Sequence, residues 1–221
     1  MPLVDASSAR SVVIAGAGGF GLEVFEYLYE ESLGGGPNIA GFIDDAKGRQ
    51  PAGIDLPNLG TTWDYRPLAN QVVVVALGSV EARQNVIMRL AERGIQVPTY
   101  IHGSVLVSST ARVGRSAVIC PFSIVNRNTT LGDGVLVNVQ SNVAHGASVG
   151  DYSVLSPGVI LNGDAAVGAR CFLGTRATIY PGVKIGANCI VDSHTGVSAS
   201  SADNKFITSG LQQVTARRIP A

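Results

Sequence analysis

An aliphatic residue recurs at every sixth position from Ile101 to Val197, and all seventeen positions of this series hold Ile, Leu or Val. The residue two places earlier in each hexad is small or Val, as at Ala117 and Ser141. A second period lies on the first, because glycines recur 18 residues apart, at Gly114, Gly132, Gly150, Gly168 and Gly186. The two periods predict coils of three short strands, about five of them stacked into a triangular prism roughly 25 Å long with one continuous core.

The first hundred residues follow a different pattern, in which short β-branched runs alternate with helical spacing. Such runs are typical of parallel strands buried on both faces. The predicted elements are a strand over Ser11–Ala15, a helix over Phe20–Ser32, strands over Ile39–Ile43 and Gln71–Leu77, a helix from its cap Ser79 to Arg93 with Gly94 at C′, and a last strand over Gln96–Ile101. A full dinucleotide domain needs two mononucleotide halves. We therefore do not expect an NAD-dependent redox enzyme.

A glycine-rich turn joins the first strand to the first helix. It has the form G-x-G-x-x-G, in which backbone N–H groups at a helix N-terminus can hold a phosphate. Two acidic residues follow the second strand, where such folds hydrogen-bond a ribose. The predicted nucleotide-sugar-binding residues are Gly16, Gly18, Gly19, Gly21, Asp44 and Asp45. The alternative is a turn that needs glycine only for close helix–strand packing. Lys47–Pro67, rich in Gly and Pro, predicts a loop over this site.

Composition excludes several partners. Charged residues make up 14% of the chain and the formal net charge is zero, so the basic surface of a nucleic-acid-binding protein is absent. No apolar run reaches transmembrane length, and Met1–Arg10 lacks the pattern of a secretory signal. We expect neither nucleic acid nor membrane as a partner. Three scattered cysteines do not form a disulfide framework and favour a cytoplasmic location.

The three histidines lie far apart on the predicted prism. His102 and His194 are five coils from each other, and His145 lies at a corner of a different face. They cannot form an intrachain three-ligand metal site, which argues against the γ-class carbonic anhydrase, a prism of the same kind. One coil after His145 lies Gly163, which leaves open space and accessible backbone beside the imidazole. A surface histidine without a catalytic role is the alternative.

The glycine-rich turn, the run Gly41–Asp45 and the hexads form a combination that resembles one bacterial family over residues 11–200. This is the sugar acyltransferase family that includes sialic acid O-acetyltransferases and the N-acetyltransferases acting on UDP-4-amino-sugars and GDP-perosamine. Its repeat region carries an Asn and, seven residues later, the catalytic His, which match Asn138 and His145. Gly174–Gly186 is also similar to the family.

The resemblance implies a Rossmann-like half-domain over residues 1–98, a left-handed parallel β-helix over 99–200 and a tail over 201–221. It also implies a homotrimer, with acetyl-CoA between two prisms, the nucleotide sugar on the N-terminal domain, no metal, and His145 as general base in a direct transfer. Asn138 is the second predicted catalytic residue. Gly163, Gly174 and Arg217 are the predicted residues of the acetyl-CoA site, although a solvated tail is the alternative for Arg217.

The chain departs from the family at the residue after the histidine, where Asp or Glu is usual and Gly146 stands here. An amine tolerates a base without an acidic partner better than a hydroxyl does, so we favour N-transfer to an amino sugar. Three alternatives remain: a sialic-acid-type O-acetyltransferase, a trimeric module that only binds nucleotide sugars, and a sugar nucleotidyltransferase. The last lacks the basic pyrophosphorylase signature.

Overall fold

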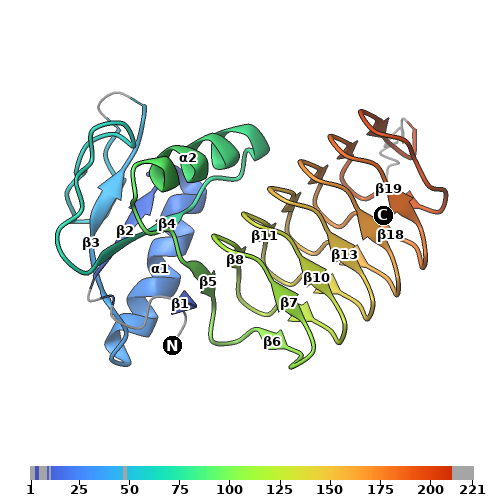
Figure 1. The fold of residues 1–221 in the computed structure, drawn as a ribbon, viewed down its shortest axis with the longest axis horizontal. Helices are drawn as coiled ribbons and strands as arrows, with labels where there is room; N and C mark the ends of the chain where they lie inside the picture. Colours follow the sequence, from blue (N-terminus) through green and yellow to red (C-terminus); the bar gives the residue numbers. More distant parts are fainter. Residues whose placement is uncertain (1–2, 5–8, 10, 47–48, 211–221) are drawn as a thin grey trace, which may run out of the picture.

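The computed structural model describes residues 3–4, 9, 11–46 and 49–210. An N-terminal α/β part packs against one end of a long parallel β-solenoid, whose coils are stacked side by side (Figure 1). The predicted fold class is confirmed. The solenoid has about six turns rather than five, because a last strand, β22 (Phe206–Ile207), extends it beyond Val197.

The N-terminal part is a three-stranded parallel sheet covered on both faces by helices. Its strand order is β3-β2-β4. Alternate strand residues face α1, as Val12 and Ile14 do, or α2, as Val13 and Ala15 do. This two-sided burial explains the uninterrupted apolar runs. The elements are β2 (Ser11–Ala15), α1 (Gly19–Leu33), β3 (Asn38–Ile43), β4 (Gln71–Val75) and α2 (Val80–Glu92).

Three parallel sheets form the solenoid, and paired residues in neighbouring coils are 18 apart, as Leu136 and Val154 are. Face 1 holds β5 (Thr99–Ile101), β8 (Val118–Ile119), β11 (Leu136–Val137), β14 (Val154–Leu155), β17 (Phe172–Leu173), β20 (Ile190–Val191) and β22. Face 2 holds β6 (Leu106–Val107), β9 (Ile124–Val125), β12 (Asn142–Val143), β15 (Ile160–Leu161), β18 (Thr178–Ile179) and β21 (Gly196–Val197). Face 3 holds β7 (Arg112–Val113), β10 (Thr130–Leu131), β13 (Ser148–Val149), β16 (Ala166–Val167) and β19 (Lys184–Ile185).

The aliphatic and small columns predicted to point inward form a single core, from Ile119 to Val197 with Ile101, Val107 and Val113 packed against it. The outer side of face 1 is buried as well over its first coils. Tyr100 and Val118 belong to the same apolar cluster as Leu28 of α1, so the N-terminal part sits on this face.

The strand predicted over Gln96–Ile101 is shorter than expected. Only Thr99–Ile101 is a strand, and this β5 begins face 1, where Tyr100 donates its N–H to the carbonyl of Ala117. The preceding residue Gln96 still accepts a hydrogen bond from Val73 of β4. On its other side β5 pairs antiparallel with β1 (Leu3–Val4). The segment therefore joins the two parts of the molecule.

The three cysteines, Cys120, Cys171 and Cys189, are all free and buried. Burial raises the pKa of the Cys120 thiol to about 12 and that of Cys171 to about 11, so neither is a reactive thiolate near neutral pH. We expect no reaction with Ellman's reagent in the native protein and three labelled thiols in denaturant. Rapid labelling of any thiol under native conditions would contradict this core-filling role.

Candidate active site

A cavity of about 210 Å³ opens at the carboxyl ends of the three N-terminal strands. Ligands of open α/β sheets bind at this edge. The loop over Lys47–Pro67 contributes Arg49 and Thr62 to its wall, as the sequence predicted, and α2 forms the opposite side. The remaining lining residues are Gly16, Ile43, Asp44, Asp45, Leu77, Ala82, Asn85, Val86 and Arg89.

The glycine-rich turn borders this cavity. Gly18 is the N-cap of α1, and Gly19 has open space around the position of a side chain. Gly21 packs on the carbonyl of Gly16, where a Cβ atom would lie only 1.9 Å from the carbonyl oxygen. Gly16 is required as well, because its φ is 115° and a Cβ atom there would lie 2.6 Å from the carbonyl oxygen of Ala76. Packing therefore requires two glycines of the motif, Gly16 and Gly21, as the alternative interpretation of this turn proposed. The phosphate-binding role of the other glycines stays a prediction.

Both aspartates at the end of β3 already have hydrogen-bond partners. The buried carboxylate of Asp44 accepts from the N–H groups of Ala17 (2.8 Å) and Ala46 (2.7 Å), which ties this strand end to the glycine-rich turn. Asp45 accepts from the N–H and hydroxyl of Thr62, at 2.7 and 2.8 Å. Both carboxylates line the cavity, but the structure gives each a role in holding loops. Their predicted contact with a ribose stays a prediction.

The sequence did not single out the cationic side of the cavity. The guanidinium of Arg89, on α2, forms an ion pair with Asp45 (2.8 Å) and lies 3.5 Å above the ring of Trp63. Arg49 pairs with Asp44 at 3.4 Å. Two guanidinium groups beside a helix N-terminus suit a phosphorylated ligand. Arg89 could have been predicted only from the orientation of α2 relative to the sheet.

Directly behind the cavity, α2 is fastened to the solenoid by a fully buried arginine. Arg83 donates to the carbonyls of Gly134 (2.7 Å), Ser116 (2.9 Å) and Val75. Burial lowers the pKa of its guanidinium to about 10, so the group is still charged at neutral pH. The three carbonyls belong to two solenoid turns and to the end of β4. Arg83 therefore links the nucleotide cavity to the coils.

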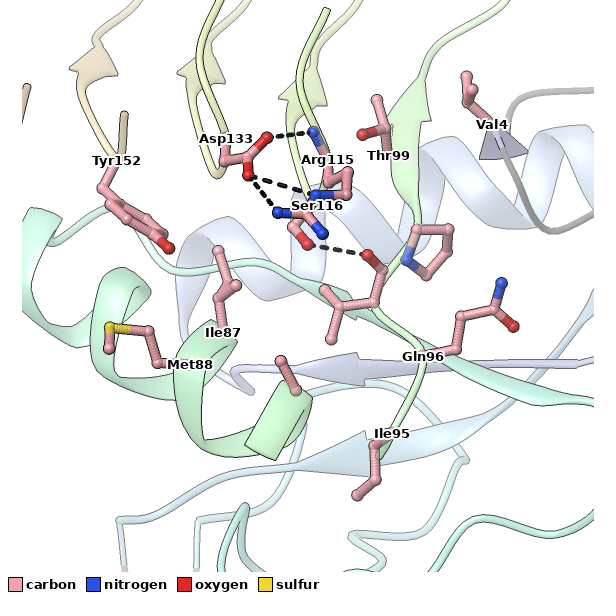
Figure 2. Close-up of a pocket in the computed structure, with 13 residues that line it drawn as sticks. Val4, Ile87, Met88, Ile95, Gln96, Thr99, Arg115, Ser116, Asp133 and Tyr152 are labelled. Carbon is pink, nitrogen blue, oxygen red and sulfur yellow. Dashed lines mark hydrogen bonds and ion pairs between the residues drawn. The ribbon is translucent and has the colours of Figure 1, made fainter. Parts of the chain in front are cut away.

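A second hollow, of about 340 Å³, lies beside this junction (Figure 2). Ile87 and Met88 of α2 line one side of it, and Arg115 and Asp133 of successive coils form an exposed ion pair on the other. The hydroxyl of Ser116 donates to the carbonyl of Val97 at 2.9 Å, which ties the linker to the first coil.

His145 lies at the corner between faces 2 and 3, after β12, and its side chain is exposed. The imidazole lies flat against Gly163 of the next coil, as the 18-residue stacking predicted. A Cβ atom on Gly163 would lie 2.5 Å from Cε1 and 2.8 Å from Nε2 of the ring. Glycine at this position thus makes room for the imidazole. The ring is open to a ligand on its solvent side.

The other predicted site residues lie apart from His145 within one chain. Asn138 follows β11, at the corner between faces 1 and 2, and its side-chain oxygen accepts from the N–H of Val139 (2.7 Å). Gly174 lies at that same corner, two coils on, against Ser193. Arg217 lies outside the described residues. The catalytic and acetyl-CoA-binding roles of these residues stay predictions.

Metal and membrane features can be stated for the described part of the chain. Within it, no group of three or more His, Cys, Asp or Glu side chains is arranged to hold a metal ion. His102 instead contacts the hydroxyl of Ser104 (2.8 Å) and the ring of Tyr27. None of the helices in these ranges combines the length and the apolarity that a membrane crossing requires.

Two family models match the chain: "PglD N-terminal domain" over residues 11–90 and "Bacterial transferase hexapeptide (six repeats)" over residues 164–199. GDP-perosamine N-acetyltransferase of Escherichia coli O157:H7 is 29% identical over 143 residues, which are 63% of this chain and 64% of that protein. The alignment thus spans a little under two thirds of that relative.

Solved structures match over more of their length. PerB from Caulobacter crescentus, in complex with CoA and GDP-perosamine, is 28% identical with a TM-score of 0.79, covering 91% of this chain and 93% of that one. The acetyltransferase domain of PglB from Neisseria gonorrhoeae FA1090, in complex with acetyl coenzyme A, is 27% identical with a TM-score of 0.78, covering 91% and 94%. The resemblance drawn from the sequence is confirmed, and the chain is homologous to these proteins.

Proposed function

We propose that this homologue of hexapeptide-repeat sugar acetyltransferases transfers an acetyl group from acetyl-CoA to the amino group of a nucleotide-linked sugar. The observation that carries the proposal is the exposed imidazole of His145 held against Gly163, in a chain related over most of its length to proteins that bind CoA and GDP-perosamine. The relative found by sequence is an N-acetyltransferase, which favours nitrogen over oxygen as the acceptor.

The N-terminal cavity is the proposed site for the nucleotide. Its arginines carry the charge that a diphosphate needs, and the amide groups at the start of α1 border the same space. Acetyl-CoA would lie along the solenoid near His145, with Gly163, Gly174 and Arg217 as the predicted contacts. The two substrates would then approach from different parts of the fold.

In the proposed reaction, the imidazole of His145 acts as a general base at the corner where it lies against Gly163. The sugar amine attacks the thioester carbonyl, a C–N bond forms, and His145 takes the proton that the nitrogen loses. The C–S bond then breaks, and the CoA thiolate leaves and receives a proton. Backbone N–H groups near Gly163 would stabilise the oxyanion of the tetrahedral intermediate. No acyl-enzyme is formed.

A homotrimer is proposed because His145 is open on one side and borders a solenoid face whose outer side carries exposed apolar residues. Leu106 and Ile160 on the outer side of face 2, and Tyr180 at its edge, are 66%, 38% and 47% exposed. Outward residues of face 3 are mostly polar, such as Arg112 and Lys184, and the first coils of face 1 are covered by the N-terminal part, whereas Ile190 and Phe206 on its last coils are exposed far from His145. Contact through face 2 would place a neighbouring prism beside His145. Light scattering of the purified protein should give three times the chain mass.

A cytoplasmic location is proposed on the same grounds. Acetyl-CoA and nucleotide sugars are cytoplasmic substrates, and three free, buried thiols fit a reducing compartment.

The direct test is an acetyl-transfer assay with purified protein, acetyl-CoA and a panel of UDP-, GDP- and dTDP-linked amino sugars. Release of free CoA, together with a mass increase of one acetyl group on one acceptor, would support the proposal. A panel of hydroxyl acceptors distinguishes the sialic-acid-type reaction. Binding of nucleotide sugars without binding of acetyl-CoA would instead identify a non-catalytic module.

Arg89 offers a test of the nucleotide cavity. Arg89→Ala should raise the KM for the nucleotide sugar about 10- to 100-fold, since it removes a charge-assisted contact and leaves the Asp45 carboxylate without its cation. The KM for acetyl-CoA should change by less than about two-fold, because only one substrate loses a contact. Arg66→Ala, which removes an exposed arginine outside the cavity, is the matched control. An equal rise in both KM values would contradict this location.

A further inference from the structure

At the corner that holds His145, two side chains on neighbouring coils each extend over a glycine of the other coil. The imidazole of His145 extends towards the next coil and lies against Gly163. Asp164 extends the opposite way, and its Oδ1 lies only 2.1 Å from the point that a Cβ atom on Gly146 would occupy. Each glycine therefore makes room for a functional group of the other coil. Consecutive Cα atoms are about 3.8 Å apart, so the imidazole and the carboxylate lie in adjacent columns of the same gap.

The backbone ties these residues together more closely. Asp164 donates its N–H to the carbonyl of His145 at 2.9 Å. The column through Gly146 is left-handed in every coil around it, with φ of 57° at Asn128, 70° at Gly146 and 59° at Asp164. Glycine, asparagine and aspartate are the residues that adopt this conformation most readily.

The Asp164 carboxylate makes no hydrogen bond within the part of the chain that the structure describes, and the residue is exposed. Carboxylates at the corner between faces 3 and 1 are engaged: Asp133 pairs with Arg115, and Asp151 accepts from the N–H of Asp133 (2.9 Å). The charged group on the coil before His145, Arg127, is exposed. The carboxylate and the imidazole thus lie in adjacent columns of one gap, and among the described residues neither group has a hydrogen-bond or ion-pair partner.

We propose that Asp164 is the positioning residue of His145: a rotation of its side chain, which no hydrogen bond restrains, brings the carboxylate to the imidazole, where it accepts the Nδ1–H and leaves Nε2 as the proton acceptor. The inference rests on the proposed function, for which it names the group that Gly146 does not supply. A carboxylate at Nδ1 fixes the tautomer and the ring orientation, and it stabilises the imidazolium that forms as the amine is attacked. The acid comes from the next coil instead of the next residue.

Two substitutions test this without unfolding the corner. Asp164→Asn and Asp164→Gly both keep a residue suited to a φ of 59°, so circular dichroism and melting temperature should match the wild type. We expect kcat to fall about 10- to 100-fold in each, with both KM values within about two-fold of wild type. Asp133→Asn, the same change of charge at another corner, should leave kcat within about two-fold. An unchanged kcat in both Asp164 variants would overturn the proposal.

The tautomer of the ring gives a readout that does not need turnover. In ¹⁵N spectra of the neutral imidazole, the wild-type His145 should carry its proton on Nδ1, and Asp164→Asn should move it to Nε2, the form that free imidazole side chains favour. His145→Ala assigns the signal among the three histidines. The Nε2–H tautomer in the wild type would overturn the proposal even if the enzyme is active. Failure of acetyl transfer with the Nδ1–H tautomer present would overturn the proposed function alone.

A double variant that exchanges the acid and the glycine tests whether the carboxylate can act on His145 from either coil. Gly146→Asp alone should clash with the Asp164 carboxylate, whereas Gly146→Asp combined with Asp164→Gly returns one acid and one glycine to the same gap. The combined variant should recover at least ten-fold of the kcat lost in Asp164→Gly. A kcat no higher than that of the Asp164→Gly variant would count against a direct action of the carboxylate on His145.

Discussion

Replacing His145 with alanine should lower kcat for acetyl transfer by about 10³-fold, the middle of the range for a general base. The KM values should change little, because the imidazole acts on the proton of the attacking amine and not on either bound substrate in its ground state. The side chain is exposed, so the free energy of unfolding should change by less than about 0.5 kcal/mol. Initial rates at saturating acetyl-CoA and nucleotide sugar measure the effect.

The control for this prediction is His102→Ala, which removes a histidine in the first coil of the solenoid. Its kcat should stay within about two-fold of wild type. His145→Gln adds a second check, since glutamine fills the space over Gly163 but cannot accept the proton. If either His145 variant kept full activity with intact oligomeric state, another group would have to be the base.

Replacing Arg83 with methionine should lower the free energy of unfolding by about 3–5 kcal/mol. The substitution keeps an unbranched apolar stem but leaves the carbonyls of Gly134, Ser116 and Val75 buried without a donor. Each such group costs about 1–3 kcal/mol. Urea unfolding at one fixed protein concentration, followed by circular dichroism, measures the loss.

Two further variants show whether the carbonyls cause the loss. Arg83→Lys keeps the charge but offers a single ammonium to three diverging acceptors, so its loss should be intermediate. Arg112→Met, an exposed arginine on face 3, should cost less than about 0.5 kcal/mol. Equal stability of Arg83→Met and Arg112→Met would show that the junction is held by apolar packing alone.

The solenoid could be predicted almost completely, because its period forces every sixth side chain inward and every eighteenth into one column. This is why the contact between His145 and Gly163 could be predicted from residue numbers. The N-terminal strands were equally clear, since continuous runs such as Val72–Val75 are buried on both faces. The strand at Thr99–Ile101 was predicted to begin three residues too early, because a short apolar run does not show which of its N–H groups will meet a neighbouring strand.

The contact between Asp164 and Gly146 could not be predicted from the 18-residue columns alone. Stacking tells which residues are neighbours, but the direction of a side chain between coils depends on the left-handed corner and on what the facing residue leaves open. The arginines that line the nucleotide cavity were not predicted, for a related reason. Arg89 lies far along the chain from Asp45 and Trp63, and it meets them only once α2 is placed on the sheet.

Because α2 is attached to two solenoid turns, the number of coils between this attachment and His145 sets the distance from the nucleotide cavity to the proposed base. Arg83 fixes the nucleotide cavity at the turns of Ser116 and Gly134, and His145 follows in the same coil as the second of these. Each coil adds about 4.8 Å along the axis. Inserting 18 residues between Gly134 and His145 would preserve every register and every core contact, yet it would shift the base by one full coil from the sugar. The solenoid would tolerate such an insertion, and the reaction would not.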